Sequence, residues 1–383
     1  MRFEFATAGR ILFGAGRCAE VPALAVPLGR CAFVVTSSHE RAAALLDRLS
    51  ALGISSVLFL VKTEPNLDHI ILALKSYKEC GCDLVIGFGG GSALDTGKAV
   101  AALAANPADP LDYLEIVGAG RVLEKPSKPF IAVPTTAGTG TEVTRNAVIT
   151  IPEKHIKVSL RSLFLLPAIA VIDPELTHSL PPEVTASTGL DALTQVLEPF
   201  VCNTPTPLTD ALCRDGIARA GRSLIKAYQD GQDADAREDM SLVSLYGGMA
   251  LANARLGAVH GMASPLGGMY PAPHGAVCAR LLPLVMEANL QALRSRQPDS
   301  PALGRYEEIA RRLTGNPSAS AEEGINHLRN LCAEMAIRPL REYGLRVEDF
   351  PSLVAQSQKA SSMKGNPIPL TEKEIVHILN GAI

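Results

Sequence analysis

The sequence of 383 residues lacks the features that mark several classes of partner. It has no long run of basic residues, and its formal net charge of −3 argues against a nucleic-acid partner held through phosphate contacts. No apolar stretch of about 18 residues is uninterrupted, so we predict no transmembrane helix. The first 14 residues alternate like a strand and do not have the layout of a signal peptide. We therefore expect a cytoplasmic protein.

Cysteine pairs with metal-site or disulfide spacing are also missing. None of the eight cysteines is spaced as a CxxC pair, which argues against a zinc ribbon. A disulfide framework is not expected in a chain of this length without a signal peptide. We interpret Cys80 and Cys82 as ordinary thiols at the junction of a helix and a strand.

The composition is that of a folded globular protein, with 47% hydrophobic and 20% charged residues. The chain is too long for one small core, so two domains are expected. In the first half, short β-branched runs alternate with amphipathic stretches, which predicts a parallel, doubly wound α/β sheet with right-handed crossovers. The predicted strands are 31–38, 55–61, 83–91 and the run from 130, and the helices between them are 41–54, 67–81 and 92–106.

The pattern changes after residues 168–176. Long alanine- and leucine-rich segments of helical period follow, so the second half is predicted to be all-helical. We expect a dinucleotide-binding α/β domain over 1–178 and a helical metal and substrate domain over 179–383.

A glycine-rich turn, Gly89-Gly90-Gly91-Ser92, leaves one predicted strand and opens a helix. Glycine lets the backbone approach a ligand closely, and the N–H groups of a helix start favour an anion. Ser92 can cap this helix, and Asp95 lies in its first turn. A plain strand-to-helix turn would have the same sequence, so the motif alone is weak evidence for a nucleotide.

A second polar turn, Pro134-Thr135-Thr136-Ala137-Gly138-Thr139-Gly140-Thr141-Glu142, follows another apolar strand. Its hydroxyls and backbone N–H groups suit a second phosphate or a ribose. A threonine-capped turn before a helix is the structural alternative. Two such turns after two strands of one sheet favour a dinucleotide.

A third group of residues lies in the helical half. Asp191 and Gln195 are four residues apart and share a helix face. His260 ends or interrupts an alanine-rich helix, and His274 follows a Pro-Ala-Pro turn and starts the next helix. A carboxylate, an amide oxygen and two imidazoles suit a divalent cation. Isolated histidines are more often core residues, and the sequence alone does not show that these four converge.

Four ordered motifs together resemble the iron-containing (group III) alcohol dehydrogenases. They are GGGSALDTGKA, PTTAGTGTEVTRNAVI, GLDALTQVLEPFV and GAVHGMASPLGGMYPAPHGAVCARLLPLVMEAN, and the resemblance covers essentially the whole chain. It implies an active site in the cleft between an α/β domain and a helical domain. It also implies NAD(H) or NADP(H), one Fe²⁺ or Zn²⁺, and a homodimer.

The resemblance also assigns site residues. It places Asp191, His260 and His274 as metal ligands and catalytic residues, with Gln195 at the fourth ligand position. The residues matching cofactor-binding positions are Gly89, Gly90, Gly91, Ser92, Asp95, Thr135, Thr136, Thr139 and Lys157.

Two positions depart from the family pattern. Gln195 and Ser264 stand where the family usually has histidine. An amide oxygen is a weaker ligand than imidazole for a borderline metal, so metal affinity is expected to fall or another metal to be preferred. Serine at position 264 removes a candidate proton-relay imidazole.

The turn over residues 36–39 bears on cofactor choice. Family members that prefer NAD often have an aspartate there, which accepts from the ribose 2′-OH and repels a 2′-phosphate. In this chain Ser37 lies in the turn and no acid is present, so NADP remains open as a cofactor.

The sequence thus predicts an oxidoreductase that interconverts a small alcohol and its aldehyde or ketone. A metal would polarise the substrate oxygen, and hydride would pass directly between the substrate and the cofactor. The alternatives are a maleylacetate-reductase-like enzyme that reduces an oxo acid without a required metal, a dehydroquinate-synthase-like lyase, and a catalytically inactive binding protein.

Overall fold

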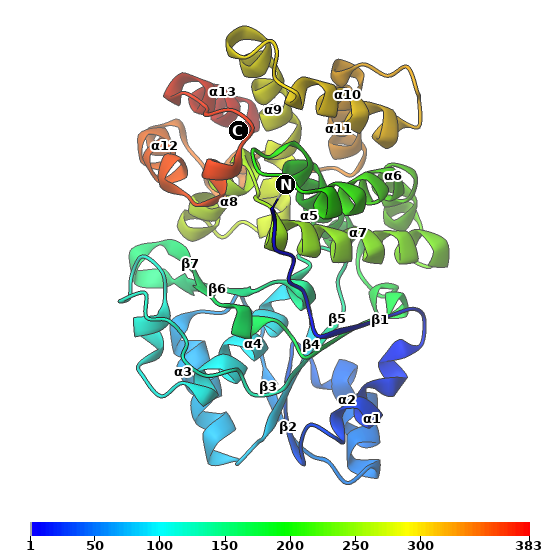
Figure 1. Ribbon diagram of the computed structural model, residues 1–383, viewed down its shortest axis with the longest axis vertical. Coiled ribbons are helices and arrows are strands. Elements are labelled where there is room, and N and C mark those ends of the chain that lie inside the picture. Colours follow the sequence, from blue (N-terminus) through cyan, green and yellow to red (C-terminus); the bar gives the residue numbers. More distant parts are fainter. Residues whose placement is uncertain (1) are drawn as a thin grey trace. The chain divides into compact units, whose positions relative to one another are not determined.

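The computed structural model describes residues 2–383, which divide into two compact units. The sheet unit comprises residues 6–136 and 140–177. The helical unit comprises residues 178–383, the segment up to Phe5, and the short segment 137–139. The division by packing therefore differs from a single boundary at residue 178, because residues 137–139 group with the helices. Each unit can be followed by colour and label in Figure 1.

The sheet unit contains a six-stranded parallel sheet in the order β1-β8-β5-β4-β2-β3. The strands are β1 (Arg10–Phe13), β2 (Cys31–Thr36), β3 (Ser55–Leu60), β4 (Leu84–Gly89), β5 (Phe130–Pro134) and β8 (Ile169–Ile172). Its helices are α1 (Val21–Ala25), α2 (His39–Ala51), α3 (Leu67–Glu79) and α4 (Gly91–Ala105).

Alternate residues of strands β2, β3, β4 and β5 pack in different clusters on the two faces of the sheet. On β2, Ala32 and Val34 pack in one cluster with α1 and α2, whereas Phe33 and Val35 pack in another with α3 and α4. Helices therefore cover both faces, as the predicted doubly wound fold requires. The predicted fold class is confirmed.

An antiparallel hairpin in the sheet unit was not predicted. Its strands are β6 (Asn146–Ile151) and β7 (Ile156–Arg161), and its inward residues join α3 and α4 in a separate apolar cluster. The chain enters β6 soon after the threonine-rich turn that follows β5. The packing of the hairpin against α3 and α4 therefore holds the end of that turn in place.

The helical unit contains α5 (Pro182–Val201), α6 (Pro207–Gln229), α7 (Ala234–Asn253), α8 (Ala258–Met269), α9 (His274–Arg296), α10 (Ala302–Thr314), α11 (Ala321–Glu334), α12 (Phe350–Lys359) and α13 (Glu372–Ala382). No strand occurs among residues 178–383, which confirms the all-helical prediction. Helix α5 packs against α6, α7 and α9, and most of its side chains are buried.

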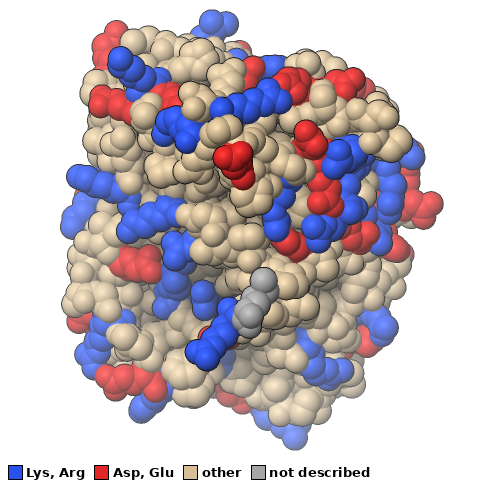
Figure 2. Space-filling model, turned by 45° about the horizontal axis from the view of Figure 1, so that its top comes forward, with Lys and Arg blue, Asp and Glu red and all other residues tan. Residues whose placement is uncertain are grey.

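Helix α9 is long and apolar enough to cross a membrane by composition alone, and it is the only such helix within residues 2–383. Its apolar window is 78% buried inside the protein, as expected for the core helix of a globular unit. Acidic and basic side chains are both spread over the face shown in Figure 2, in keeping with the small net charge.

Candidate active site

The predicted nucleotide turns lie together at the carboxyl edge of the sheet. Strands β2 and β4 are neighbours, but the helices that follow them cover opposite faces, which makes this a topological switch point. A Cβ built on Gly89 would lie 4.0 Å from the backbone nitrogen of Ser37, and one on Gly90 would lie 3.3 Å from the Thr136 side chain. The Thr135 N–H donates to the Gly89 carbonyl at 3.0 Å. Three turns from three strands therefore meet at one place.

Helix α4 begins at this edge, and its first backbone N–H groups lie at the glycine-rich turn. Gly90 is the N-cap residue, and no side chain in the described part of the chain caps the helix. Ser92 lies inside the first turn, so the expectation that it caps the helix was wrong. Uncapped N–H groups at a helix start are a ready site for an anion such as a pyrophosphate.

Asp95 lies beyond the first turn of α4, so the prediction that it lies in that turn was wrong, and its side chain is buried. Its carboxylate accepts from the Thr141 hydroxyl at 3.2 Å and from the Val148 N–H at 3.1 Å. Burial raises the pKa of Asp95 to about 6, and burial lowers the pKa of nearby Lys98 to about 8. The Lys98 ammonium donates to Thr144 and to the Asn146 carbonyl. Both side chains thus hold the segment after the threonine turn against α4.

Lys157 and Thr139 complete the set of predicted cofactor-binding residues. Lys157 is on β7, and its ammonium is 2.6 Å from the Glu64 carboxylate, with only 6% of the lysine side chain exposed. Thr139 belongs to the segment 137–139, which groups with the helical unit.

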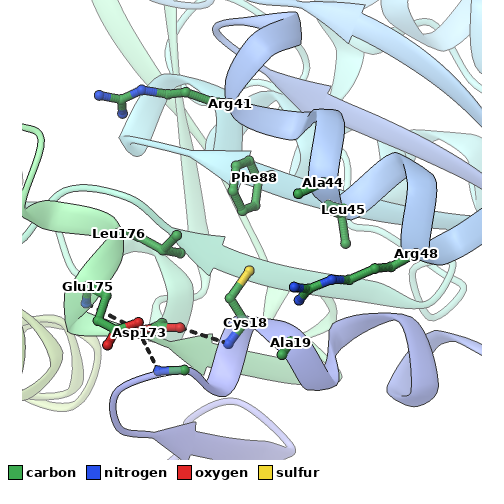
Figure 3. Close-up of a pocket in the computed structure, with 11 residues that line it drawn as sticks. Cys18, Ala19, Arg41, Ala44, Leu45, Arg48, Phe88, Asp173, Glu175 and Leu176 are labelled. Atoms are coloured by element: carbon green, nitrogen blue, oxygen red, sulfur yellow. Dashed lines mark hydrogen bonds between the residues drawn. The ribbon is translucent and has the colours of Figure 1, made fainter.

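A cavity of about 300 Å³ lies on the α1 and α2 side of the sheet unit (Figure 3). Phe88, Leu176 and the Cys18 thiol point into it, and Arg41 and Arg48 line it from α2. Asp173, just after β8, closes one end by accepting from the N–H groups of Gly16 and Cys18. Its lining therefore combines an apolar wall with two cationic and two acidic side chains. No motif in the sequence indicated this cavity.

In the helical unit, four potential metal ligands converge from three helices. They are Asp191 on α5, His260 on α8, and His274 and Cys278 on α9, and one donor atom from each lies within 4.8 Å of all the others. His260 Nε2 is 3.5 Å from Asp191 Oδ1, and His274 Nε2 is 4.0 Å from the same oxygen. All but His274 are buried.

His260 is held in place by Glu198. The Nδ1 atom of His260 is 2.7 Å from Glu198 Oε2, and Glu198 Oε1 accepts from the Val259 N–H at 2.7 Å. A carboxylate on one ring nitrogen fixes the imidazole so that the other nitrogen is directed at a ligand. Here that other nitrogen is Nε2, which is the atom facing Asp191.

The donor set fits a divalent cation. Asp191 Oδ1 is buried and, within residues 2–383, has no hydrogen-bond partner. Leaving a buried carboxylate oxygen unpartnered is costly, and a cation would satisfy it. Although burial opposes ionisation, the imidazoles of His260 and His274 lower the pKa of Asp191 below its usual value. The carboxylate is therefore in the form that binds metal.

Gln195 makes a hydrogen bond to a residue outside the cluster of potential metal ligands. Its amide nitrogen donates to the Gly138 carbonyl at 3.2 Å, which fastens the segment 137–139 to α5. This segment lies close to α5, because a Cβ on Gly138 would be 2.7 Å from the Cβ of Thr188. The other amide atom, Oε1, is buried and has no hydrogen-bond partner among the described residues.

Sequence reasoning missed Glu198 and Cys278. Both could have been found by helical spacing, because Glu198 is two turns after Asp191 and Cys278 is one turn after His274. The expected position of His260 was also wrong in detail. It lies in the first turn of α8, after α7 has ended at Asn253, rather than at the end of an alanine-rich helix. His274 does start α9, as predicted.

The chain is similar to known proteins over nearly all of its length. Residues 8–174 match the family described as iron-containing alcohol dehydrogenase, and residues 185–383 match the C-terminal region of the Fe-containing alcohol dehydrogenase family. Alcohol dehydrogenase 4 of Saccharomyces cerevisiae is 40% identical over 319 residues, covering 83% of this chain and 80% of that protein. The 1,3-propanediol dehydrogenase of Citrobacter freundii is 35% identical and covers 92% of both.

Solved structures of two alcohol-oxidising enzymes are also similar to this chain over its whole length. A 1,3-propanediol oxidoreductase matches with a TM-score of 0.92 at 32% identity, covering 100% of both chains. An alcohol dehydrogenase from Oenococcus oeni matches with a TM-score of 0.91 at 34% identity, also covering 100% of both.

Proposed function

Because the chain belongs to the iron-containing alcohol dehydrogenase family and interconverts an alcohol and its aldehyde or ketone with a nicotinamide cofactor, we propose that one divalent cation assists it, held by Asp191, His260 and His274. The convergence of His260 and His274 on one buried oxygen of Asp191, which has no hydrogen-bond partner among the described residues, supports the proposal most strongly. Gln195 is a weak further ligand or a hydrogen-bond partner of a bound water. Fe²⁺ and Zn²⁺ both suit imidazole and carboxylate donors.

Each protein group has a role around that site. The cation, when bound, supplies Lewis-acid stabilisation of charge on the substrate oxygen. Asp191 contributes a negative charge, and Glu198 keeps His260 Nε2 aimed at the site. The hydride transfer itself is the cofactor's chemistry, for which the protein provides binding and orientation.

We place the cofactor on the carboxyl edge of the sheet unit. Its pyrophosphate would lie on Gly89, Gly90, Gly91 and Ser92 at the start of α4, with Thr135, Thr136 and Thr139 on the second turn and Lys157 at a ribose. The cavity lined by Phe88 and Leu176 would take the adenosine end. NADP is accepted as well as NAD, because Ser37 puts no acid in the turn over residues 36–39 to repel a 2′-phosphate and Arg41 lies in the first turn of α2.

Substrate, compartment and oligomeric state are proposed in more general terms. The substrate is a small alcohol or diol, in line with the propanediol dehydrogenases among the relatives. We propose a cytoplasmic homodimer; the eight cysteines, all free thiols, suit a reducing compartment.

One experiment tests the proposal as a whole. NADH and NADPH oxidation is followed with a panel of small aldehydes and ketones, before chelation, after it, and after Fe²⁺ or Zn²⁺ is restored. Activity should disappear with the metal and return with it. Full activity in protein that elemental analysis shows to be free of stoichiometric metal would rule out the metal-assisted mechanism.

A further inference from the structure

Cys278 lies among the proposed metal ligands although no sequence motif assigned it a role. It is on α9, one turn after His274, and it is fully buried. Its Sγ atom is 3.6 Å from His274 Nε2. Its sulfur lies within 4.8 Å of the donor atoms of Asp191 and His260 as well. The thiol therefore faces all three of the proposed ligands.

The distances between these donors are those of one coordination shell. With metal–nitrogen bonds of about 2.0–2.1 Å and a zinc–sulfur bond of about 2.3 Å, the edges of a tetrahedron are roughly 3.4–3.6 Å. The separations in the structure are 3.5 Å from His260 to Asp191, 4.0 Å from His274 to Asp191, and 3.6 Å from Cys278 to His274. Small side-chain movements would bring all four onto one ion.

We propose that Cys278 is the fourth protein ligand of the cation, bound as a thiolate, and that the site is an Asp-His-His-Cys centre. This inference rests on the proposed function, because it assumes the cation at Asp191, His260 and His274. On binding, the sulfur–hydrogen bond breaks, a metal–sulfur bond forms, and the proton leaves to solvent without any change in oxidation state. Gln195 then remains available to hold the Gly138 carbonyl.

A thiolate changes which metal the site prefers. Sulfur is a soft ligand that selects zinc over harder cations, whereas carboxylate and imidazole alone accept iron equally. Asp191 and Cys278 together balance the two charges of the cation, so the centre as a whole is neutral. A substrate oxygen would then enter as a fifth ligand, which catalytic zinc sites can accommodate.

Cobalt and zinc loading of the full-length protein tests this assignment. Cobalt-loaded wild type should show thiolate-to-cobalt charge-transfer absorption in the near ultraviolet, and X-ray absorption of the zinc form should show one sulfur neighbour. Cys278→Ser should lose the absorption and weaken zinc binding by about 100-fold, measured by chelator competition. Cys213→Ser is the matched control, because Cys213 is equally buried on α6 and outside the cluster. The control should behave as wild type.

The outcomes separate this inference from the proposed function. If one metal binds per chain and is lost in His274→Ala, but wild type shows no sulfur ligation, the cation site stands and the role of Cys278 is overturned. If wild type binds no stoichiometric metal, both fail. The X-ray absorption measurement uses wild type alone, so it decides the question even when Cys278→Ser does not fold.

Discussion

The carboxyl edge of the sheet unit and the donor cluster of the helical unit are built in opposite ways. The edge consists of backbone and small residues in short continuous motifs, such as Gly89 to Ser92. Because these residues have little or no side chain, a ligand can approach the backbone there. The cluster consists of side chains separated by up to 87 positions, from Asp191 to Cys278, brought together only by helix packing. The edge should therefore be damaged by adding atoms, and the cluster by removing them.

The largest expected effect is in the cluster. His274→Ala removes an imidazole donor and should lower kcat/KM at least about 1000-fold, or about 4 kcal/mol, together with metal content. The side chain is 33% exposed, so the fold should persist. Steady-state kinetics, elemental analysis and circular dichroism measure the three quantities. His377→Ala, an exposed histidine on α13, is the control. A variant that keeps its metal and its activity would contradict the ligand assignment.

The matching change at the sheet edge adds atoms. Gly91→Val places a branched side chain at the start of α4, where the pyrophosphate would lie, and should weaken cofactor binding at least about tenfold, or about 1.4 kcal/mol. Fluorescence titration with NADH measures this. Gly304→Val serves as control, because a Cβ at Gly304 meets nothing within 4 Å. Unchanged affinity in a folded Gly91→Val protein would remove the turn from the cofactor site.

A smaller effect is expected from charge at the same edge. Ser37→Asp should shift the ratio of kcat/KM values toward NADH by about tenfold, because the new carboxylate repels a 2′-phosphate. Ser37→Ala, which adds no charge, should leave the ratio nearly unchanged. If wild type uses NADH alone and the aspartate alters neither cofactor, discrimination occurs somewhere else.

The last prediction concerns stability rather than activity, in the interior below the threonine turn. Burial raises the pKa of Glu142 to about 7, so the native state holds this proton more tightly than the unfolded chain does. Its contribution to stability is present below about pH 4.5 and is lost as the pH rises through about 7, at most about 1.4 kcal/mol per pH unit.

Glu142→Gln should therefore flatten this part of the pH dependence of the urea midpoint. Glu153→Gln, at an exposed residue just after β6, should not change it. Equal slopes for wild type and Glu142→Gln would show that Glu142 does not titrate in this range.

The residue pattern alone predicted most of the sheet edge, whereas three residues of the cluster were assigned only through the family resemblance and Cys278 was not predicted at all. Strand and helix alternation placed the turns after β2, β4 and β5, and parallel strands bring such turns to one edge whatever the details of packing. The β6 and β7 hairpin was missed because its strands alternate buried and half-buried residues and lack the continuous apolar runs that marked β2, β4 and β5. No sequence rule gives the angle at which α5, α8 and α9 meet, so the convergence of Asp191, His260 and His274 needed the structure. Helix α7 ends at Asn253 and α8 begins after its N-cap Gly257, which places His260 in the first turn of a new helix.

The pairing of β1 with β8 has a consequence for the order in which the chain assembles. Arg10 aligns with Ile169 and Phe13 with Ile172, so the first strand in the sequence joins the last strand of the sheet. Contacts this distant along the chain carry a high loop-closure cost and form slowly. The central strands can pair as they emerge from the ribosome, but β1 must wait until residue 172 has been made. The N-terminal strand, although synthesised first, is the last piece that can complete the sheet.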